Sequence, residues 1–384
     1  MSHTPAVDVS APLREAITEA QRLIDNPPFE CSAQDRAEGY DYLAGSIRSC
    51  IQMAFDYDLA HPVLINPTHQ YARQGLDNPD ALYFTAHLDP EGDYLVTGRR
   101  GTTTDLSFQV MDGTYSAEGA PGSVAAFDDR ELEIDEDGTF SWHLKAGHGG
   151  KTLIIREVYD DWVGQDRGTL WIKRLDTVGQ QRPPVSVEAI AKRYSVAAKM
   201  LVGRINTWFA FPEWFTYKEP VNTLTVPAST PGGLASQFSS IGHYSLAEDE
   251  AMIVTVPVAP CPYQAIQIGS RWYVSTDYEH HQTSLNKSQS VADPDGFFRY
   301  VISQRDPHVA NWLETCGHPQ GVMMLRWQRL DSPLTAADGP RAEVVPFAAL
   351  ADHLPYAADH QITPADYTAR IEARKVGIAR RMLS

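Results

Sequence analysis

Hydrophobic and polar positions follow two different periods along the chain. Over residues 11–59 apolar side chains recur every three or four positions, which is typical of amphipathic helices. Pro27-Pro28 ends the first of these helices. We expect the second to begin near Ser32, with Asp35 in its first turn, and both to pack on a sheet body.

Beyond residue 62 the period changes to two, and short apolar runs alternate with turn residues. The first set of expected strands spans 82–88, 94–99, 106–110, 132–134, 140–144, 152–156 and 171–175. A spacing of about ten residues between turns favours a sandwich or barrel over alternating βαβ units. A helix capped by Ser186 should then cover 187–210, and an aromatic cluster follows it over 208–217.

A second set of strands is expected at 251–256, 265–268, 272–278, 297–303 and 322–328. A looser tail should lead to a last amphipathic helix over 365–382, with Thr363 as its N-cap. The pattern predicts a mainly β fold with α additions (α+β): two β-sandwich-like regions with N-terminal, central and C-terminal helices. The expected divisions are an N-terminal helical segment, a first β-rich domain, a linking helix with the aromatic segment, and a second β-rich domain: 1–61, 62–182, 183–220 and 221–384.

Composition narrows the classes of function. The chain has 384 residues and a formal charge of −17, which disfavours nucleic acid and anionic membranes as partners. Its four cysteines lie far apart with no CxxC spacing, which argues against structural zinc or a disulfide framework. With neither a secretory signal nor an apolar run of membrane-spanning length in view, we expect a cytoplasmic protein.

Two arginines mark a candidate site between Trp272 and Trp327. Arg299 and Arg326 lie on expected strands among apolar neighbours, where a charge is costly unless it has a partner or faces a cavity. One interpretation is that they hold an anionic group of a substrate. The alternative is a structural ion pair within a sandwich, for which Asp277 is one available carboxylate.

Histidines in the same stretch are the candidates for proton transfer near neutral pH. We expect His280, His281 and His318 in this role, with Asp277 orienting one of them. No two potential ligands lie at an established metal-binding spacing, and nothing marks Cys316 as an activated nucleophile. We therefore expect neither a metal nor a cofactor. The other expected substrate contacts are apolar walls and polar groups: Tyr278, Trp312, Asn286, Asn311 and Arg99.

Part of the second β region resembles a known family. The residues that carry the resemblance are Ser284-Leu285-Asn286, Gln289, Asp293 to Gly296, Asp306-Pro307, Asn311-Trp312-Leu313 and Leu325-Arg326-Trp327. Together they are similar to the domain of unknown function 1214, which is often found with domain 1254, and the likeness covers roughly residues 240–330. Trp327 stands where many members carry a tyrosine. The resemblance implies a β-rich fold and no particular reaction.

These observations favour an enzyme that acts by acid–base chemistry, without a redox cofactor, on a small, partly apolar or anionic molecule in a cleft between the β regions. The alternative is a non-catalytic module that recognises a carbohydrate or a protein; a metal-dependent hydrolase is a third hypothesis. An enzyme predicts that the histidines and an arginine converge in one closed pocket. A binding module predicts a shallow aromatic surface and separated histidines. Self-association into a homo-oligomer is left open.

Overall fold

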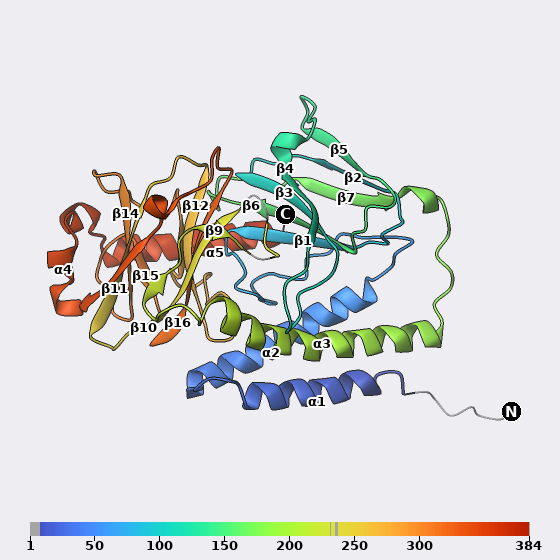
Figure 1. Ribbon diagram of the computed structural model, residues 1–384, viewed down its shortest axis with the longest axis horizontal. Helices are drawn as coiled ribbons and strands as arrows, with labels where there is room; N and C mark the ends of the chain where they lie inside the picture. Colours follow the sequence, from blue (N-terminus) through green and yellow to red (C-terminus); the bar gives the residue numbers. More distant parts are fainter. Residues whose placement is uncertain (1–7, 231, 235–236, 384) are drawn as a thin grey trace.

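The protein is mainly β with helical additions (Figure 1), as the sequence predicts. The computed structural model describes residues 8–230, 232–234 and 237–383. Four sheets form two sandwiches, and three long helices lie together along one side of both. Within the described residues, no helix is long and apolar enough to cross a membrane.

The first sandwich follows the first set of expected strands. Its larger sheet has the order β1-β6-β3-β4 and its smaller one β5-β2-β7, and the paired strands are antiparallel. The strands are β1 (Ala81–His87), β2 (Tyr94–Arg99), β3 (Asp105–Met111), β4 (Ser123–Asp128), β5 (Thr139–Leu144), β6 (Thr152–Val158) and β7 (Thr169–Arg174). Inward side chains of both sheets, such as Val96 and Phe108, fill the core between them.

The second sandwich has a sheet of order β13-β12-β16-β10-β8, with β9 also paired to β10, packed on a sheet of order β15-β14-β11-β17. Its strands are β8 (Thr223–Leu224), β9 (Ala228–Ser229), β10 (Phe238–Ser245), β11 (Glu250–Pro257), β12 (Tyr263–Gly269), β13 (Ser284–Asn286), β14 (Phe297–Ser303), β15 (Trp312–Glu314), β16 (Gln320–Gln328) and β17 (Arg341–Pro346). Val254, Tyr300 and Trp327 are fully buried in the core between these sheets.

Three helices pack into one layer: α1 (Ala11–Asp25), α2 (Ala33–Phe55) and α3 (Val187–Phe215). The predicted caps are confirmed. Ser32 and Asp35 form a capping box at the start of α2, and the Ser186 hydroxyl accepts from the Ala189 N–H at the start of α3. These bonds satisfy amide groups that have no partner inside the helix.

A final helix, α5 (Pro364–Leu383), ties the two sandwiches together. Thr363 and Asp366 form reciprocal bonds at its start, so the predicted cap is confirmed. The Arg374 guanidinium stacks on Trp162 of the first β region at 4.5 Å and donates to the Tyr278 carbonyl of the second. Shorter helical pieces also occur: η1 (Asp129–Glu131), η2 (Leu175–Thr177), η3 (Ala336–Asp338), η4 (Phe347–Ala349), α4 (Leu350–His353) and η5 (Ala357–His360).

The strand expected at 272–278 is wrong. Tyr273 has φ 57°, a left-handed conformation that a strand cannot contain, and the Ser270 N–H donates to the Val274 carbonyl to close a turn. The turn places Trp272 against α2, where it is 1% exposed and its indole N–H donates to the Asp35 carbonyl at 2.8 Å. Packing on the helix, which periodicity does not encode, reduces the sheet pairing of this stretch to an isolated bridge between Ser275 and Gly269.

Three other expectations need correction. The strand near 132–134 reduces to one bridge at Ile134, and the missed strand β4 precedes it. The tail expected to be loose contains β17, which pairs with β11. Helix α3 continues through Pro212 to Phe215 because its aromatic side chains pack in a buried cluster that offsets the lost hydrogen bond.

Candidate functional site

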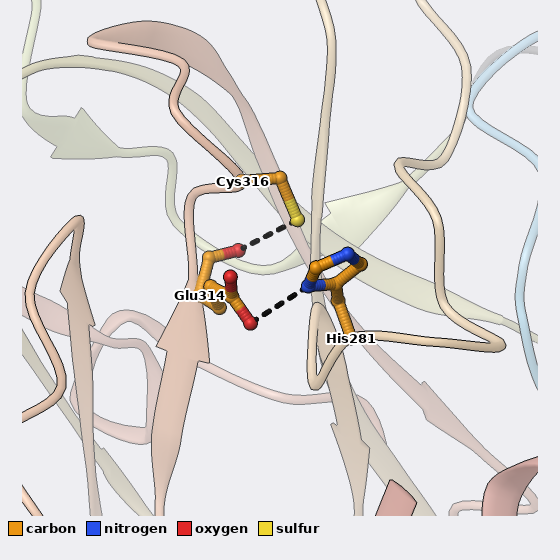
Figure 2. Close-up of side chains that lie close together, drawn as sticks. All are labelled: His281, Glu314 and Cys316. Atoms are coloured by element: carbon orange, nitrogen blue, oxygen red, sulfur yellow. Dashed lines mark hydrogen bonds and ion pairs between the residues drawn. The ribbon is translucent and has the colours of Figure 1, made fainter.

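Two of the predicted histidines lie close together in sequence and have separate partners. His280 Nδ1 is 3.0 Å from Asp277 Oδ2 on an exposed turn, so Asp277 contacts one of the histidines. His281 Nδ1 is 2.9 Å from Oε2 of Glu314, beside the thiol of Cys316 (Figure 2). The Glu314 hydrogen bond raises the pKa of His281.

The third histidine, His318, connects the second sandwich to helix α2. It is 3% exposed, with Nδ1 3.2 Å from Asp35 and Nε2 2.9 Å from Glu38. Burial lowers its pKa, but the bonds and charges of Glu38 and Asp35 outweigh burial and raise it. A carboxylate beside each ring nitrogen favours the protonated imidazolium form of His318. In this form the side chain cross-links the second sandwich to helix α2.

Two of the three predicted arginines contact neighbouring residues, and the third lines a large cavity. Arg299 forms an ion pair with Asp293 and another with Asp295 at 2.7 Å, which is the structural alternative left open by the sequence. Arg99 is exposed and its Nε–H donates to the Asp137 carbonyl within a hairpin. Arg326, in contrast, is 6% exposed and lines a large cavity.

The remaining predicted contacts are buried away from that cavity and have partners of their own: Tyr278, Asn286, Asn311 and Trp312. Asn286 donates to the Asp80 carboxylate at 2.9 Å, and Asn311 exchanges two hydrogen bonds with the backbone of Val291. These side chains hold the second sandwich in shape, so their contacts in the structure are internal ones.

The cavity has a volume of about 1080 Å³, slightly above the ~300–1,000 Å³ usual for ligand sites. It lies between the two β regions and the helical layer. Its walls come from α2, α3, the sheet face of β1, β6 and β3, and the end of β16. An apolar side is formed by Leu76, Trp208, Phe211, Tyr273 and Met324, which pack in one cluster.

Three arginines face this space without a carboxylate partner among the described residues: Arg156, Arg204 and Arg326. Their bonds go to neutral oxygens. Arg156 donates to Gln109 at 2.9 Å, and Arg204 donates to the Ser49 hydroxyl at 2.7 Å. Arg326 donates to the Leu76 carbonyl at 2.6 Å and also to Gln267. Burial lowers the pKa of Arg156, as expected for a charge with little compensation.

A carboxyl and two phenols lie within electrostatic reach of these arginines. Asp77 is 5% exposed and accepts from the backbone N–H and hydroxyl of Ser275. Burial raises its pKa more than Arg73 and Ser275 lower it. Burial likewise raises the pKa of Tyr83, and that of Tyr115 to about 12. The site thus combines fixed positive charge with groups that can hold or give a proton.

Two residues of the same wall have left-handed backbone conformations. Leu76 has φ 51° and Tyr273 has φ 57°, and the Leu76 N–H donates to the Tyr273 carbonyl at 2.7 Å. Left-handed conformations of such residues are uncommon and cost roughly 1–3 kcal/mol each. The surrounding packing therefore holds both residues in place, and Asp77 follows directly after one of them.

Comparison with known proteins supports the architecture. The chain is similar to the crystal structure of an uncharacterized protein from Burkholderia cenocepacia, with 29% identity and a TM-score of 0.79, over 89% of this chain and 97% of that one. VPA0106 from Vibrio parahaemolyticus aligns at 12% identity and a TM-score of 0.41, over 80% and 98%, which is too distant to support an argument. No family model and no curated protein matches the chain. The resemblance to domain 1214 stays a prediction.

Proposed function

We propose that the chain binds a small molecule with an anionic group and an apolar body in the cavity between its β regions. The observation that carries this is the presence of Arg156, Arg204 and Arg326 on the wall, none of them paired to a carboxylate within the described part of the chain. A buried positive charge that bonds only to neutral oxygens is costly, because no negative charge compensates it. The arrangement therefore favours an anionic ligand as the missing negative charge. The adjoining aromatic wall suits the apolar body.

The proposal includes acid–base chemistry on the bound molecule. Asp77 is a buried carboxyl whose raised pKa lies closer to neutrality than that of an exposed aspartate, as a general acid or base requires. Tyr83 and Tyr115 line the same cavity and offer hydroxyl groups. None of the three predicted histidines lines it, so we assign them no step in this cavity.

The cavity and the histidines bear on the choice between an enzyme and a binding module. The volume of the cavity, about 1080 Å³, favours a small ligand over the shallow aromatic surface that a carbohydrate- or protein-binding module predicts. Because none of the three predicted histidines lines the cavity, binding and catalysis need separate tests. We also propose a reducing, cytoplasmic location, since all four cysteines are free thiols.

Binding is tested by calorimetry with two probes of matched size that differ in charge, the anion decanoate and the neutral amide decanamide. We expect decanoate to bind the parent at least about tenfold more tightly, because only the carboxylate can pair with the arginines. Arg156→Gln should remove most of that preference. Arg99→Gln, which changes an exposed arginine outside the cavity, is the matched control and should leave it unchanged. Equal affinity for the two probes would contradict an anion site.

Catalysis is tested with Asp77→Asn, which keeps the size of the side chain and removes its proton-transfer role. For any carboxylate substrate turned over by the parent, we expect kcat to fall about 100-fold or more while the affinity for decanoate changes little. If turnover persists in this variant, Asp77 is not the general acid or base. If no carboxylate that binds is turned over, the site serves binding alone.

A further inference from the structure

A second group of reactive side chains lies outside the cavity, on the second sandwich. His281, in the loop before β13, meets Glu314 at the end of β15 and Cys316 in the turn that follows (Figure 2). One nitrogen, one carboxylate oxygen and one sulfur, one from each residue, all lie within 4.8 Å of one another. None of these residues lines the cavity, so the cluster is independent of the proposed anion site.

Backbone contacts hold the three side chains in position. The Glu314 N–H donates to the carbonyl of Gln282, the residue after His281, at 3.0 Å, and Gln282 itself is buried. Cys316 has φ 53° and is followed by Gly317 at φ 83°, so the chain turns sharply between Glu314 and His318. Gln34 of α2 donates to the Cys316 carbonyl at 2.7 Å and fixes that turn. A strained residue held by its surroundings is characteristic of functional sites.

The local charge favours a cation. The carboxylates of Glu314, Asp277 and Glu38 lie within electrostatic reach of the Cys316 thiol. The thiol is therefore surrounded by negative potential, which attracts a cation. The Tyr367 hydroxyl donates to Glu314 Oε2 at 2.9 Å and so orients the carboxylate from outside the group.

We propose that His281, Glu314 and Cys316 bind one Zn²⁺ ion, leaving its fourth tetrahedral position for water. Thiolate, imidazole and carboxylate are all zinc ligands, and three protein ligands with an open position are typical of reactive zinc sites. Ca²⁺ and Mg²⁺ are disfavoured because they require mainly oxygen ligands. Binding converts the Cys316 thiol to a thiolate and releases its proton to solvent, and an imidazolium at His281 releases a second.

The neighbouring group of Asp35, Glu38 and His318 has a different arrangement. There each ring nitrogen faces its own carboxylate, at 3.2 and 2.9 Å, which suits a protonated histidine better than a ligand. This group therefore serves as the cross-link already described, and the zinc site is assigned to the group around Cys316.

The test is titration of chelator-treated full-length protein with Zn²⁺ alone, in competition with a chromophoric chelator, followed by the absorption spectrum with Co²⁺. We expect one ion per chain and a thiolate-to-cobalt charge-transfer band. Cys316→Ser should abolish the band, and Glu314→Gln should weaken Zn²⁺ binding by about 100-fold. Cys31→Ser and His280→Ala change the same residue types outside the group and should behave like the parent.

Several results would overturn the site. They are the absence of bound Zn²⁺, a Co²⁺ complex of the parent without a charge-transfer band, or unchanged affinity in Glu314→Gln with native circular dichroism. The Co²⁺ spectrum of the parent decides on the thiolate even if a variant fails to fold. Failure here would leave decanoate binding unaffected, so the two proposals are tested separately.

Discussion

Asp105, at the start of β3, is a carboxyl group held almost out of contact with water. It is 1% exposed, its Oδ1 lies 3.4 Å from Arg329, and its Oδ2 has no hydrogen-bond partner among the described residues. Burial raises its pKa to about 6, although the positive charge of Arg329 opposes the shift. The folded state therefore holds this proton over a range of pH in which the unfolded chain has lost it.

The raised pKa of Asp105 predicts how the stability of an Asp105→Asn variant depends on pH. Between pH 3.8, the usual pKa, and about 6, the contribution of Asp105 to stability falls as pH rises, and the full cost remains above pH 6. At pH 7 we expect the variant to be about 1–3 kcal/mol more stable than the parent, and at pH 4 little different. Urea unfolding at the two pH values measures this. Asp331→Asn, an exposed neighbour, is the control and should show no such difference.

Charged residues on apolar faces were the best sequence signal for the cavity. A lone charge on a strand needs a partner or a cavity, and Arg326, which was expected on this ground, does line the cavity. The same argument applies to Arg156 on the central strand β6, and to Arg204, which shares the buried stripe of α3 with Leu201 and Ile205. Arg299 follows the other alternative, a structural ion pair, because Asp293 and Asp295 lie six and four residues before it and pair with it.

At the scale of elements, the contact of α2 with Trp272 depends on a glycine. A Cβ added at Gly39 would lie 2.4 Å from the Trp272 ring and 2.9 Å from Ile24, which is closer than real contacts allow. Gly203, in α3, is the matched helical position, because a Cβ there meets no atom within 4 Å. Both glycines lie inside helices, but only Gly39 is in close contact with other side chains.

We expect opposite effects from alanine at these positions. Gly39→Ala should lower the free energy of unfolding by about 1–3 kcal/mol, since overpacking displaces Trp272. Gly203→Ala should raise it by about 0.5–1 kcal/mol through improved helix propensity. Chemical denaturation followed by circular dichroism measures both. If Gly39→Ala is as stable as Gly203→Ala, the helix does not pack on Trp272 as described.

The sequence predicted features that depend on neighbouring residues and missed features that depend on residues far away in the chain. The caps at Ser32, Ser186 and Thr363 depend on atoms within three residues, and all are present. The turn at Tyr273 depends on α2 and on Leu76, nearly 200 residues earlier in the chain, so its strand-like alternation was misleading. The three residues of the proposed zinc site are likewise distant in sequence, because Glu314 and Cys316 lie over 30 residues after His281.

For the whole molecule, the position of the positive charge is the main result. The chain has a formal charge of −17, yet its large cavity contains Arg156, Arg204 and Arg326 with Asp77 as the buried acid. The fold class could be predicted because it follows from periodicity and turn spacing. A cleft between the β regions was expected as well, but most of the residues that line the cavity could not be predicted, because its walls come from both β regions and two helices and meet only in the folded chain.

The most direct test of this account is a crystal structure of the protein with bound decanoate. We expect electron density for the ligand in the cavity, with its carboxylate within hydrogen-bonding distance of at least one of Arg156, Arg204 and Arg326. Its alkyl chain should lie against Trp208 and Phe211. An empty cavity at saturating decanoate, or a carboxylate directed away from all three guanidinium groups, would contradict the central claim.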